Sequence, residues 1–201
     1  MASAAALRLP AGGGFVYDPA AMALRRILKF PAPELKKNAP ELGEIDGQVD
    51  ELLRDMADTM YAAPGVGLAA PQIGVPARAI TIDVDHENPG KQLLRLINPV
   101  IVERDGTVLW EEACLSVVDF AAEVRRSAKV LVKAWTLDQQ EVAIEADGLL
   151  AIALQHEIDH LDGKLFIDRV SALKRDSYKR RIRKMIRDGV SLDELPSRPA
   201  I

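Results

Sequence analysis

The spacing of apolar residues predicts a helix in the first third of the chain. Apolar side chains recur every three or four positions over residues 45–61, at Val49, Leu52, Leu53, Met56 and Met60. This period places them on one face of a helix that packs against a core. Pro64 and Gly65 follow and end the predicted helix.

A different pattern, typical of strands, occupies the middle of the chain. Residues 78–85 alternate, with Ile80, Ile82 and Val84 on one side and Thr81, Asp83 and Asp85 on the other. This alternation predicts a strand that is buried on one face only. After a turn at 86–90, further strand-like runs occupy residues 93–103, 107–111, 129–136 and 140–145.

Two more helices are predicted in the last third. Asp147 is a helix-capping residue and Gly163 a helix-stopping one, and the segment between them is apolar through its first half. This helix is therefore expected to be buried. Another helical pattern covers residues 171–188. The order helix, strands, helix, helix predicts an α+β fold with antiparallel sheets, rather than alternating βαβ units.

Composition limits the class of protein. The 201 residues are 48% hydrophobic and 28% charged with a net charge of −4, which indicates one globular domain and no DNA partner. No apolar run is long enough to span a membrane. The single cysteine, Cys114, excludes an internal disulfide and fits a reducing, cytoplasmic location.

The chain ends are expected to differ from the domain between them. Residues 1–21 are rich in Ala, Gly and Pro and have no repeating apolar face, so we expect a disordered extension. The folded domain is expected over residues 22–188, followed by a tail at 189–201.

The sharpest chemical signal is a His-Glu-x-x-His motif at residues 156–160. On a helix, His156 and His160 lie one turn apart on the same face and can reach one metal ion. Glu157 projects near that face and can act as general base. By chance the motif also occurs on surface helices, but two histidines in a buried helix need polar partners.

The third metal ligand is open on these grounds. Catalytic sites of this type have three protein ligands, and Phe166 stands where one protease group has a third histidine. The candidates are His86, the downstream acids Asp168, Asp176 and Glu194, and Cys114. A lone cysteine is otherwise usually a small buried apolar residue.

Three segments in order resemble the peptide deformylase family. They are GVGLAAPQ at 65–72, EACLS at 112–116 and QHEIDH at 155–160. The similarity extends from about Met22 to about Arg187 and implies the family's fold, in which antiparallel sheets pack around the buried helix. It also implies the family's activity, removal of the formyl group from nascent N-formylmethionyl peptides.

The resemblance further implies a metal centre and its catalytic residues. Cys114, His156 and His160 would hold Fe²⁺, with Zn²⁺, Ni²⁺ or Co²⁺ as possible substitutes. Glu157 would transfer the proton, and Gln72 and the Leu115 backbone N–H would stabilise the oxyanion.

Substrate contacts are carried over from the family in the same way. The backbone of Val66 and Gly67 would line the peptide, and Glu112 would orient a ligand. Val66 would also wall the methionine pocket with three residues of the buried helix, Leu149, Ile152 and Ala153. Those three are equally expected as core positions.

Three positions depart from the family pattern. Ala113 stands where Gly is usual and Val118 where Pro is frequent, and Ala121 replaces an arginine found in some members. A methyl group at Ala113 would narrow the cleft if that residue needed a positive φ. The loop expected after Val118 would be less fixed without proline.

The last predicted helix is strongly basic. Residues 174–187 hold eight Lys or Arg and one acid, Asp176. The pattern fits a solvated helix face, or a surface that docks on the ribosome. Two alternatives to a deformylase stay open: a His-Glu-x-x-His zinc endopeptidase with a downstream acidic ligand, and a non-enzymatic ribosome-bound module.

Overall fold

The computed structural model describes residues 24–85 and 87–195. Its strands are β1 Gly67–Ala69, β2 Ala79–Ile82, β3 Leu94–Asp105, β4 Val108–Cys114, β5 Val117–Arg126, β6 Lys129–Trp135 and β7 Glu141–Asp147. Its α-helices are α1 Gly47–Ala62, α2 Gly148–Leu161 and α3 Ala172–Arg187. The described ranges also contain four short 3-10 helices: η1 Pro33–Lys36, η2 Ala70–Ile73, η3 Phe166–Asp168 and η4 Leu192–Glu194.

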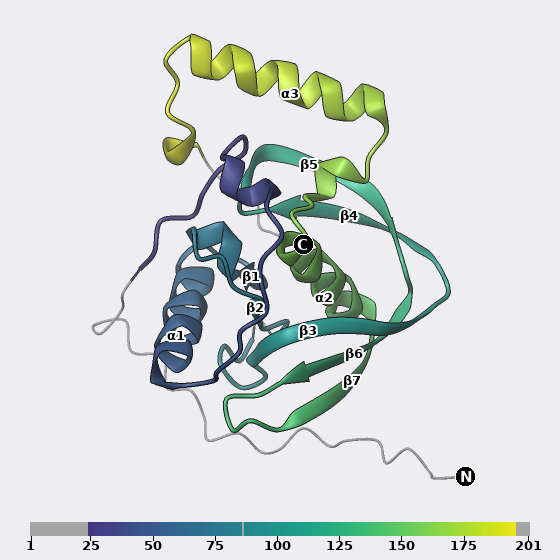
Figure 1. The fold of residues 1–201 in the computed structure, drawn as a ribbon. Helices are drawn as coiled ribbons and strands as arrows, with labels where there is room; N and C mark the ends of the chain where they lie inside the picture. Colours follow the sequence, from purple (N-terminus) through teal and green to yellow (C-terminus); the bar gives the residue numbers. More distant parts are fainter. Residues whose placement is uncertain (1–23, 86, 196–201) are drawn as a thin grey trace.

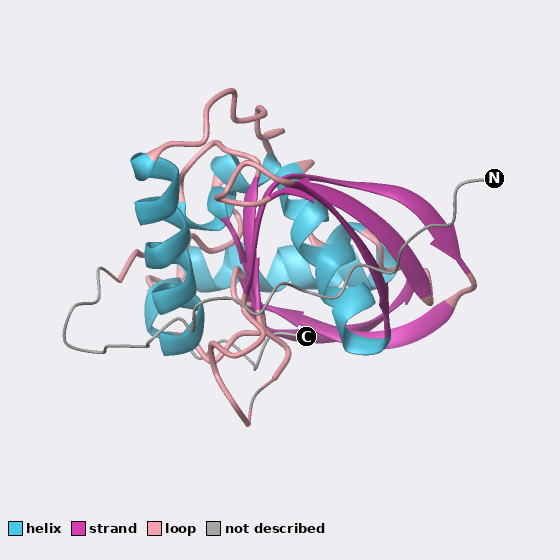
Figure 2. Ribbon diagram, turned by 90° about the horizontal axis from the view of Figure 1, so that it is seen from below, coloured by secondary structure: helices cyan, strands magenta, loops and turns pink. Residues whose placement is uncertain are grey.

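The strands form two antiparallel sheets around α2. The larger sheet has the order β1-β2-β3-β6-β7, and β4 pairs with β5 in a second, two-stranded sheet. Helix α2 contacts every strand of the larger sheet and lies between it and β4–β5 (Figure 1). The strands bend along their length past the helices (Figure 2). The expected α+β fold, with antiparallel sheets around a buried helix, is confirmed.

The predicted helices are present, although Asp147, the expected capping residue of α2, precedes that helix without a side-chain cap hydrogen bond. Helix α1 begins at Asp46, whose carboxylate accepts hydrogen bonds from the backbone N–H of Gln48 and Val49. Its apolar face is buried against the core. Helix α2 is followed by Gly163, whose φ of 66° is left-handed and favours glycine.

The strand at 78–85 differs from its prediction. The structure has a shorter strand, β2, in which all four residues are buried. The reason is that β2 lies between β1 and β3 and contacts α1 as well as α2, so both of its faces are covered. Thr81 stays buried by donating to the Leu68 carbonyl at 3.5 Å.

Residues 117–126 are a second difference. The loop expected there is strand β5, which pairs with β4 along its length. Its alternation is clear only over its last part, where Ala122, Val124 and Arg126 point inward and the residues between them are exposed. The polar Arg126 hides that pattern in the sequence.

Helix α3 packs on β5 through few residues. Tyr178 and Ile182 are its buried residues, and Arg181 pairs with Asp119 of β5 at 2.9 Å. The rest of the helix is largely exposed along one end of the molecule (Figure 1). Within the described ranges, no helix is long and apolar enough to cross a membrane. Residues 1–21, for which disorder is expected, lie outside the described residues.

Candidate metal centre

Helix α2 presents two different faces. Ala151, Leu154, Ile158 and Leu161 pack into the core against the larger sheet. The other face carries, at helical spacing, Leu149, Ile152, His156 and His160. The apolar face fixes the helix on the sheet, and the two imidazoles, with ring centroids 4.9 Å apart, then face the β4–β5 sheet.

The β4–β5 hairpin brings Cys114 to these histidines. Cys114 pairs with Val117, so Leu115 and Ser116 form the tight turn between the strands. The Cys114 Sγ lies 3.3 Å from the Nε2 of His160. One donor atom from each of Cys114, His156 and His160 lies within 4.8 Å of the others, and all three residues are buried. We call these three residues the ligand cluster.

The donors of the ligand cluster fit a divalent transition metal. One sulfur and two imidazole nitrogens, with a fourth position for water, are the set that catalytic zinc and related ions take. The surroundings move the pKa values of the two imidazoles apart. Burial lowers both, but Cys114 and Glu112 raise the pKa of His156 above its usual range, whereas that of His160 falls well below.

The other candidates for third ligand are placed differently. Asp168 accepts hydrogen bonds from Lys36 and the Leu165 backbone, and Asp176 is exposed on α3. His86 lies outside the described residues. Phe166 is buried against the aromatic ring of Phe120. Glu194 is exposed in η4, so the geometry favours Cys114 over Asp168, Asp176 and Glu194.

Glu112 lies beside His156, and Arg126 supports it. The His156 Nδ1 is 2.8 Å from Glu112 Oε2, and Arg126 donates to both carboxylate oxygens at 2.6 and 2.9 Å. Burial alone would raise the pKa of Glu112, but the hydrogen bonds of Arg126 and His156 lower it to about 2. The carboxylate stays charged and can orient the His156 ring.

Arg126 also links this carboxylate to Asp159 of α2. It donates to Asp159 Oδ2 at 2.6 Å, and Arg169 donates to the same carboxylate. We call Glu112, Arg126, Asp159 and Arg169 the ion-pair network. Sequence reasoning missed Arg126, Asp159 and Arg169. Asp159 lies inside the motif, but the buried Arg126 could be found only by placing β5 next to α2.

Glu157 is buried beside the ligand cluster, and one of its carboxylate oxygens is not hydrogen-bonded to any described residue. That oxygen is Oε2, and burial raises the pKa of Glu157 to about 7. Gly67 covers its carboxylate so closely that a Cβ there would lie 2.3 Å from Oε1. A carboxyl group that titrates near neutrality suits general acid–base work.

Gln72 reaches the same region from η2. Its Oε1 accepts from the Ala69 backbone at 2.8 Å, which turns its Nε2 toward Ser116 Oγ at 3.2 Å and Cys114 Sγ at 3.7 Å. Leu115 is buried in the hairpin turn beside the sulfur. Both residues are thus held near the ligand cluster.

The expected substrate residues lie around the same helix. Val66 is buried, and its carbonyl accepts from the backbone of Asp83 at 2.9 Å. Ile152 is buried on the helix face that carries His156, and Leu149 is partly exposed there. Val66 and Ala153 both belong to the main apolar core.

The fold accommodates the three residues that depart from the family pattern. Ala113 is buried in β4, and its φ is not among the positive values of the described residues. Val118 and Ala121 belong to β5 rather than to a loop, and Val118 is buried in an apolar cluster with Phe166. Strand pairing therefore fixes this segment without proline.

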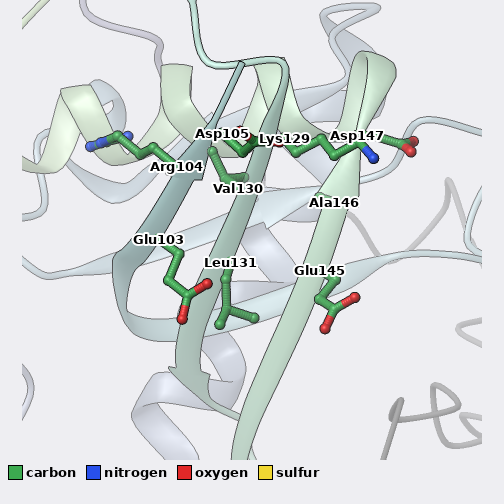
Figure 3. A pocket seen from close by; sticks show the side chains of 9 residues that line it. All are labelled: Glu103, Arg104, Asp105, Lys129, Val130, Leu131, Glu145, Ala146 and Asp147. Carbon is green, nitrogen blue, oxygen red and sulfur yellow. The ribbon is translucent and has the colours of Figure 1, made fainter. Parts of the chain in front are cut away.

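An open hollow of about 400 Å³ lies elsewhere, over β3, β6 and β7. In Figure 3 the side chains of Glu103, Leu131 and Glu145 lie in one row across the three strands, as the strand register requires. The hollow contains none of the predicted site residues and is lined mainly by solvated charges.

Comparison with known families gives one consistent result. Residues 24–176 match the family model described as polypeptide deformylase. A peptide deformylase of Syntrophobacter fumaroxidans is 44% identical over 170 residues, covering 85% of this chain and all of the relative. One of Acidobacterium capsulatum is 48% identical over 169 residues, covering 84% and 99%.

Solved structures agree with the sequence relatives. A peptide deformylase from Legionella pneumophila superposes with a TM-score of 0.76 at 44% identity, covering 83% of this chain and 98% of that one. The enzyme from Ehrlichia chaffeensis in complex with actinonin gives 0.76 at 34% identity, covering 83% and 99%. The similarity therefore includes both the fold and the segments of the site.

Proposed function

The chain belongs to the polypeptide deformylase family, and we propose that it carries out that family's reaction with the ligand cluster and Glu157. As a member it is a hydrolase that removes the N-formyl group from nascent polypeptides. The observation that supports our assignment of residues is the position of Cys114. Its sulfur, from a separate sheet, lies against the two histidines of α2.

The proposed cofactor is one divalent metal ion held by Cys114, His156 and His160. When bound, such an ion supplies a Lewis acid that activates water and polarises the formyl carbonyl. The donor set supports a transition metal. We propose Fe²⁺ as the resident ion, with Zn²⁺, Ni²⁺ or Co²⁺ able to replace it. Metal analysis of protein purified without oxygen tests this choice.

Glu157 is the proposed carrier of the proton. It takes a proton from the attacking water and delivers it to the leaving amine. Its pKa of about 7 supports both steps, because the carboxyl group can accept and release a proton at neutral pH. Its unpartnered Oε2 supports the same role, since a buried oxygen without a partner is available to the reacting groups.

Two donors are proposed to stabilise the oxyanion. Gln72 offers its Nε2, which the Ala69 backbone already orients, and Leu115 offers its backbone N–H from the hairpin turn. Both lie near Cys114, so they would border the formyl oxygen, on which the negative charge develops. Preorganised donors of this kind are among the largest contributions to catalysis.

The substrate peptide is proposed to run beside β1. This short strand is at the end of the larger sheet and pairs with β2 on its inner side, so its outer edge can accept an added strand. Gly67 and Val66 would supply the backbone contacts. Val66, Leu149, Ile152 and Ala153 would wall the methionine side chain at the start of α2.

Formate release from formyl-Met-Ala-Ser tests the proposed function. The iron-loaded wild type should release formate, and Glu157→Ala should lose most of the activity while keeping its metal. No formate from correctly folded, metal-loaded wild type would contradict the proposal and favour a non-enzymatic ribosome-bound module.

The alternative, a zinc endopeptidase, makes the opposite prediction for one variant. Its third ligand would be a downstream acid, so Cys114→Ala would keep the metal. Under our proposal Cys114→Ala loses it, because two histidines alone hold a metal weakly. Metal content after dialysis, with Ser177→Ala on the surface of α3 as control, separates the two.

We also propose that α3 docks this enzyme on the ribosome, in the cytoplasm where nascent chains emerge. Its exposed positive charges support the idea. Since Tyr178 and Ile182 are buried, charge reversal tests the proposal better than truncation. Lys174→Glu with Arg183→Glu should weaken ribosome binding at low salt. Arg104→Glu with Lys129→Glu, on the strands, should not.

A further inference from the structure

The segment before the first helix crosses both loops that carry the proposed oxyanion donors. The backbone N–H of Leu28 donates to the Gln72 carbonyl at 2.7 Å, and that of Phe30 donates to the Ser116 carbonyl at 2.8 Å. Between these two contacts lies Lys29, which is half-buried. A residue far from the three family segments is therefore held against the metal-binding hairpin.

The side chain of Lys29 completes a continuous path to the metal-binding sulfur. Its Nζ donates to the Leu115 carbonyl at 2.6 Å. That carbonyl and the N–H of Ser116 belong to one peptide group, and the Ser116 N–H donates to Cys114 Sγ at 3.4 Å. The path thus leads from the ammonium group of Lys29 through the Leu115–Ser116 peptide group to the sulfur of Cys114.

A peptide group that accepts from a cation becomes a stronger donor at its other end. Hydrogen bonds from ionised groups are shorter and stronger than neutral ones, and chains of hydrogen bonds polarise one another in a buried setting. Lys29 therefore strengthens the N–H···S contact of Ser116. Hydrogen bonds to a ligating sulfur draw electron density away from it and tune the metal.

The charges of Lys29 and Cys114 also interact directly. Burial lowers the pKa of Lys29 below its ordinary value, and the negative charges of Cys114 and Asp193 offset only part of this shift. The hydrogen bonds through the peptide group and the positive charge of Lys29 both draw electron density away from the Cys114 sulfur.

We propose that Lys29 is a positioning residue that weakens electron donation from the Cys114 thiolate to the metal through the Leu115–Ser116 peptide group. The proposal rests on the proposed function, because it requires a metal on the ligand cluster. Its consequence is a more strongly polarising metal. Replacing Lys29 by a neutral residue should reduce kcat by about tenfold, the lower end of the effect of outer contacts on metal sites, with KM unchanged.

Absorption of the Co²⁺-substituted protein tests the proposal directly. A thiolate bound to Co²⁺ gives a sulfur-to-metal charge-transfer band, whose energy falls as the sulfur becomes a better donor. Lys29→Met should move this band to longer wavelength. Lys29→Arg, which keeps the charge and the donors, should return it toward the wild-type position. Lys37→Met, an exposed lysine of the same segment, should leave it unchanged.

The outcomes separate this inference from the proposed function. If wild type shows no sulfur-to-cobalt band, the metal site itself is wrong. If wild type shows the band and Lys29→Met leaves its position and kcat unchanged, only the role of Lys29 is wrong. A Lys29→Met protein that is less stable but has the wild-type band has the same meaning, since a purely structural residue would behave so. Should Lys29→Met not fold, Lys29→Gln is the neutral variant, with the same two readings.

Discussion

Two groups of buried polar residues meet at helix α2 and differ in whether their polar atoms have hydrogen-bond partners. In the ion-pair network, Arg126 joins Glu112 and Asp159 through short hydrogen bonds. On the catalytic side, Glu157 Oε2 and His160 Nδ1 are buried and have no hydrogen-bond partner within the part of the chain that the structure describes. The two groups lie within one turn of helix of each other, so burial is not what distinguishes them.

This difference distinguishes residues that hold the structure in place from residues that take part in the reaction. A buried polar atom without a partner is costly, and proteins keep few of them. A buried charge that is fully paired fixes geometry and leaves no capacity to bind a reactant. The unpaired Glu157 Oε2 therefore marks where water and substrate are expected, and the paired atoms mark the frame that holds the ligands.

The largest expected effect comes from removing the unpaired carboxylate. Glu157→Gln keeps the shape of the side chain but cannot transfer a proton, so kcat for formate release should fall by about 10²–10⁴-fold. The free energy of unfolding at pH 8 should not fall, because wild type buries a poorly partnered carboxylate there. Urea unfolding and the formate assay measure the two quantities. Glu111→Gln, exposed on β4, is the control. A clear loss of stability in Glu157→Gln would mean that this side chain supports the fold.

The ion-pair network should respond in the opposite way. Arg126→Met leaves Glu112 and Asp159 buried without their shared cation, which should lower the free energy of unfolding by about 3–5 kcal/mol. The neighbouring Arg125→Met, on the exposed side of β5, should change it little. Urea unfolding of both metal-loaded variants gives the comparison. Equal stability of the two would show that the network is not a structural frame.

Periodicity predicted the helices better than the strands. The apolar stripe of α1 and the apolar first half of α2 are set by burial against one surface, and one surface leaves a clear pattern. Strand β2 was expected to have a polar face, but α1 covers it. Strand β5 was missed because a buried arginine occupies one of its inward positions.

The site was predictable to the extent that its residues are close in sequence. The helical period alone places His156 and His160 together. Cys114 lies 46 residues before His160, and no local pattern brings them into contact. Only the resemblance to a family selected Cys114 over the acids. No sequence pattern indicated that Arg126 is buried, because its burial depends on ion pairs with the carboxylates of Glu112 and Asp159.

A smaller effect is expected where the backbone touches the catalytic carboxylate. Gly67→Ala would place a Cβ 2.3 Å from Glu157 Oε1, so the flexible end of that side chain must move. A displacement of about 1 Å at a catalytic group costs about 10² in rate, while the fold should persist. Gly47→Ala, whose Cβ would meet nothing within 4 Å, is the matched control. Unchanged kcat/KM in Gly67→Ala would mean that the position of Glu157 is not critical.

The last comparison uses pH, since the two groups contain carboxyl groups whose pKa values shift in opposite directions. The pKa of Glu112 is lowered to about 2, so its stabilising contribution is complete above its ordinary value of 4.5 and is lost as pH falls toward 2. The pKa of Glu157 is raised to about 7, so its contribution to stability declines as pH rises from 4.5 to 7.

In chelator-treated protein, Glu112→Gln should flatten the acid side of the stability curve by at most about 1.4 kcal/mol per pH unit. Glu157→Gln should flatten only the neutral side. Urea unfolding across pH 2.5–8 measures both slopes, and a change on the same side in both variants would remove the distinction between the paired and unpaired groups.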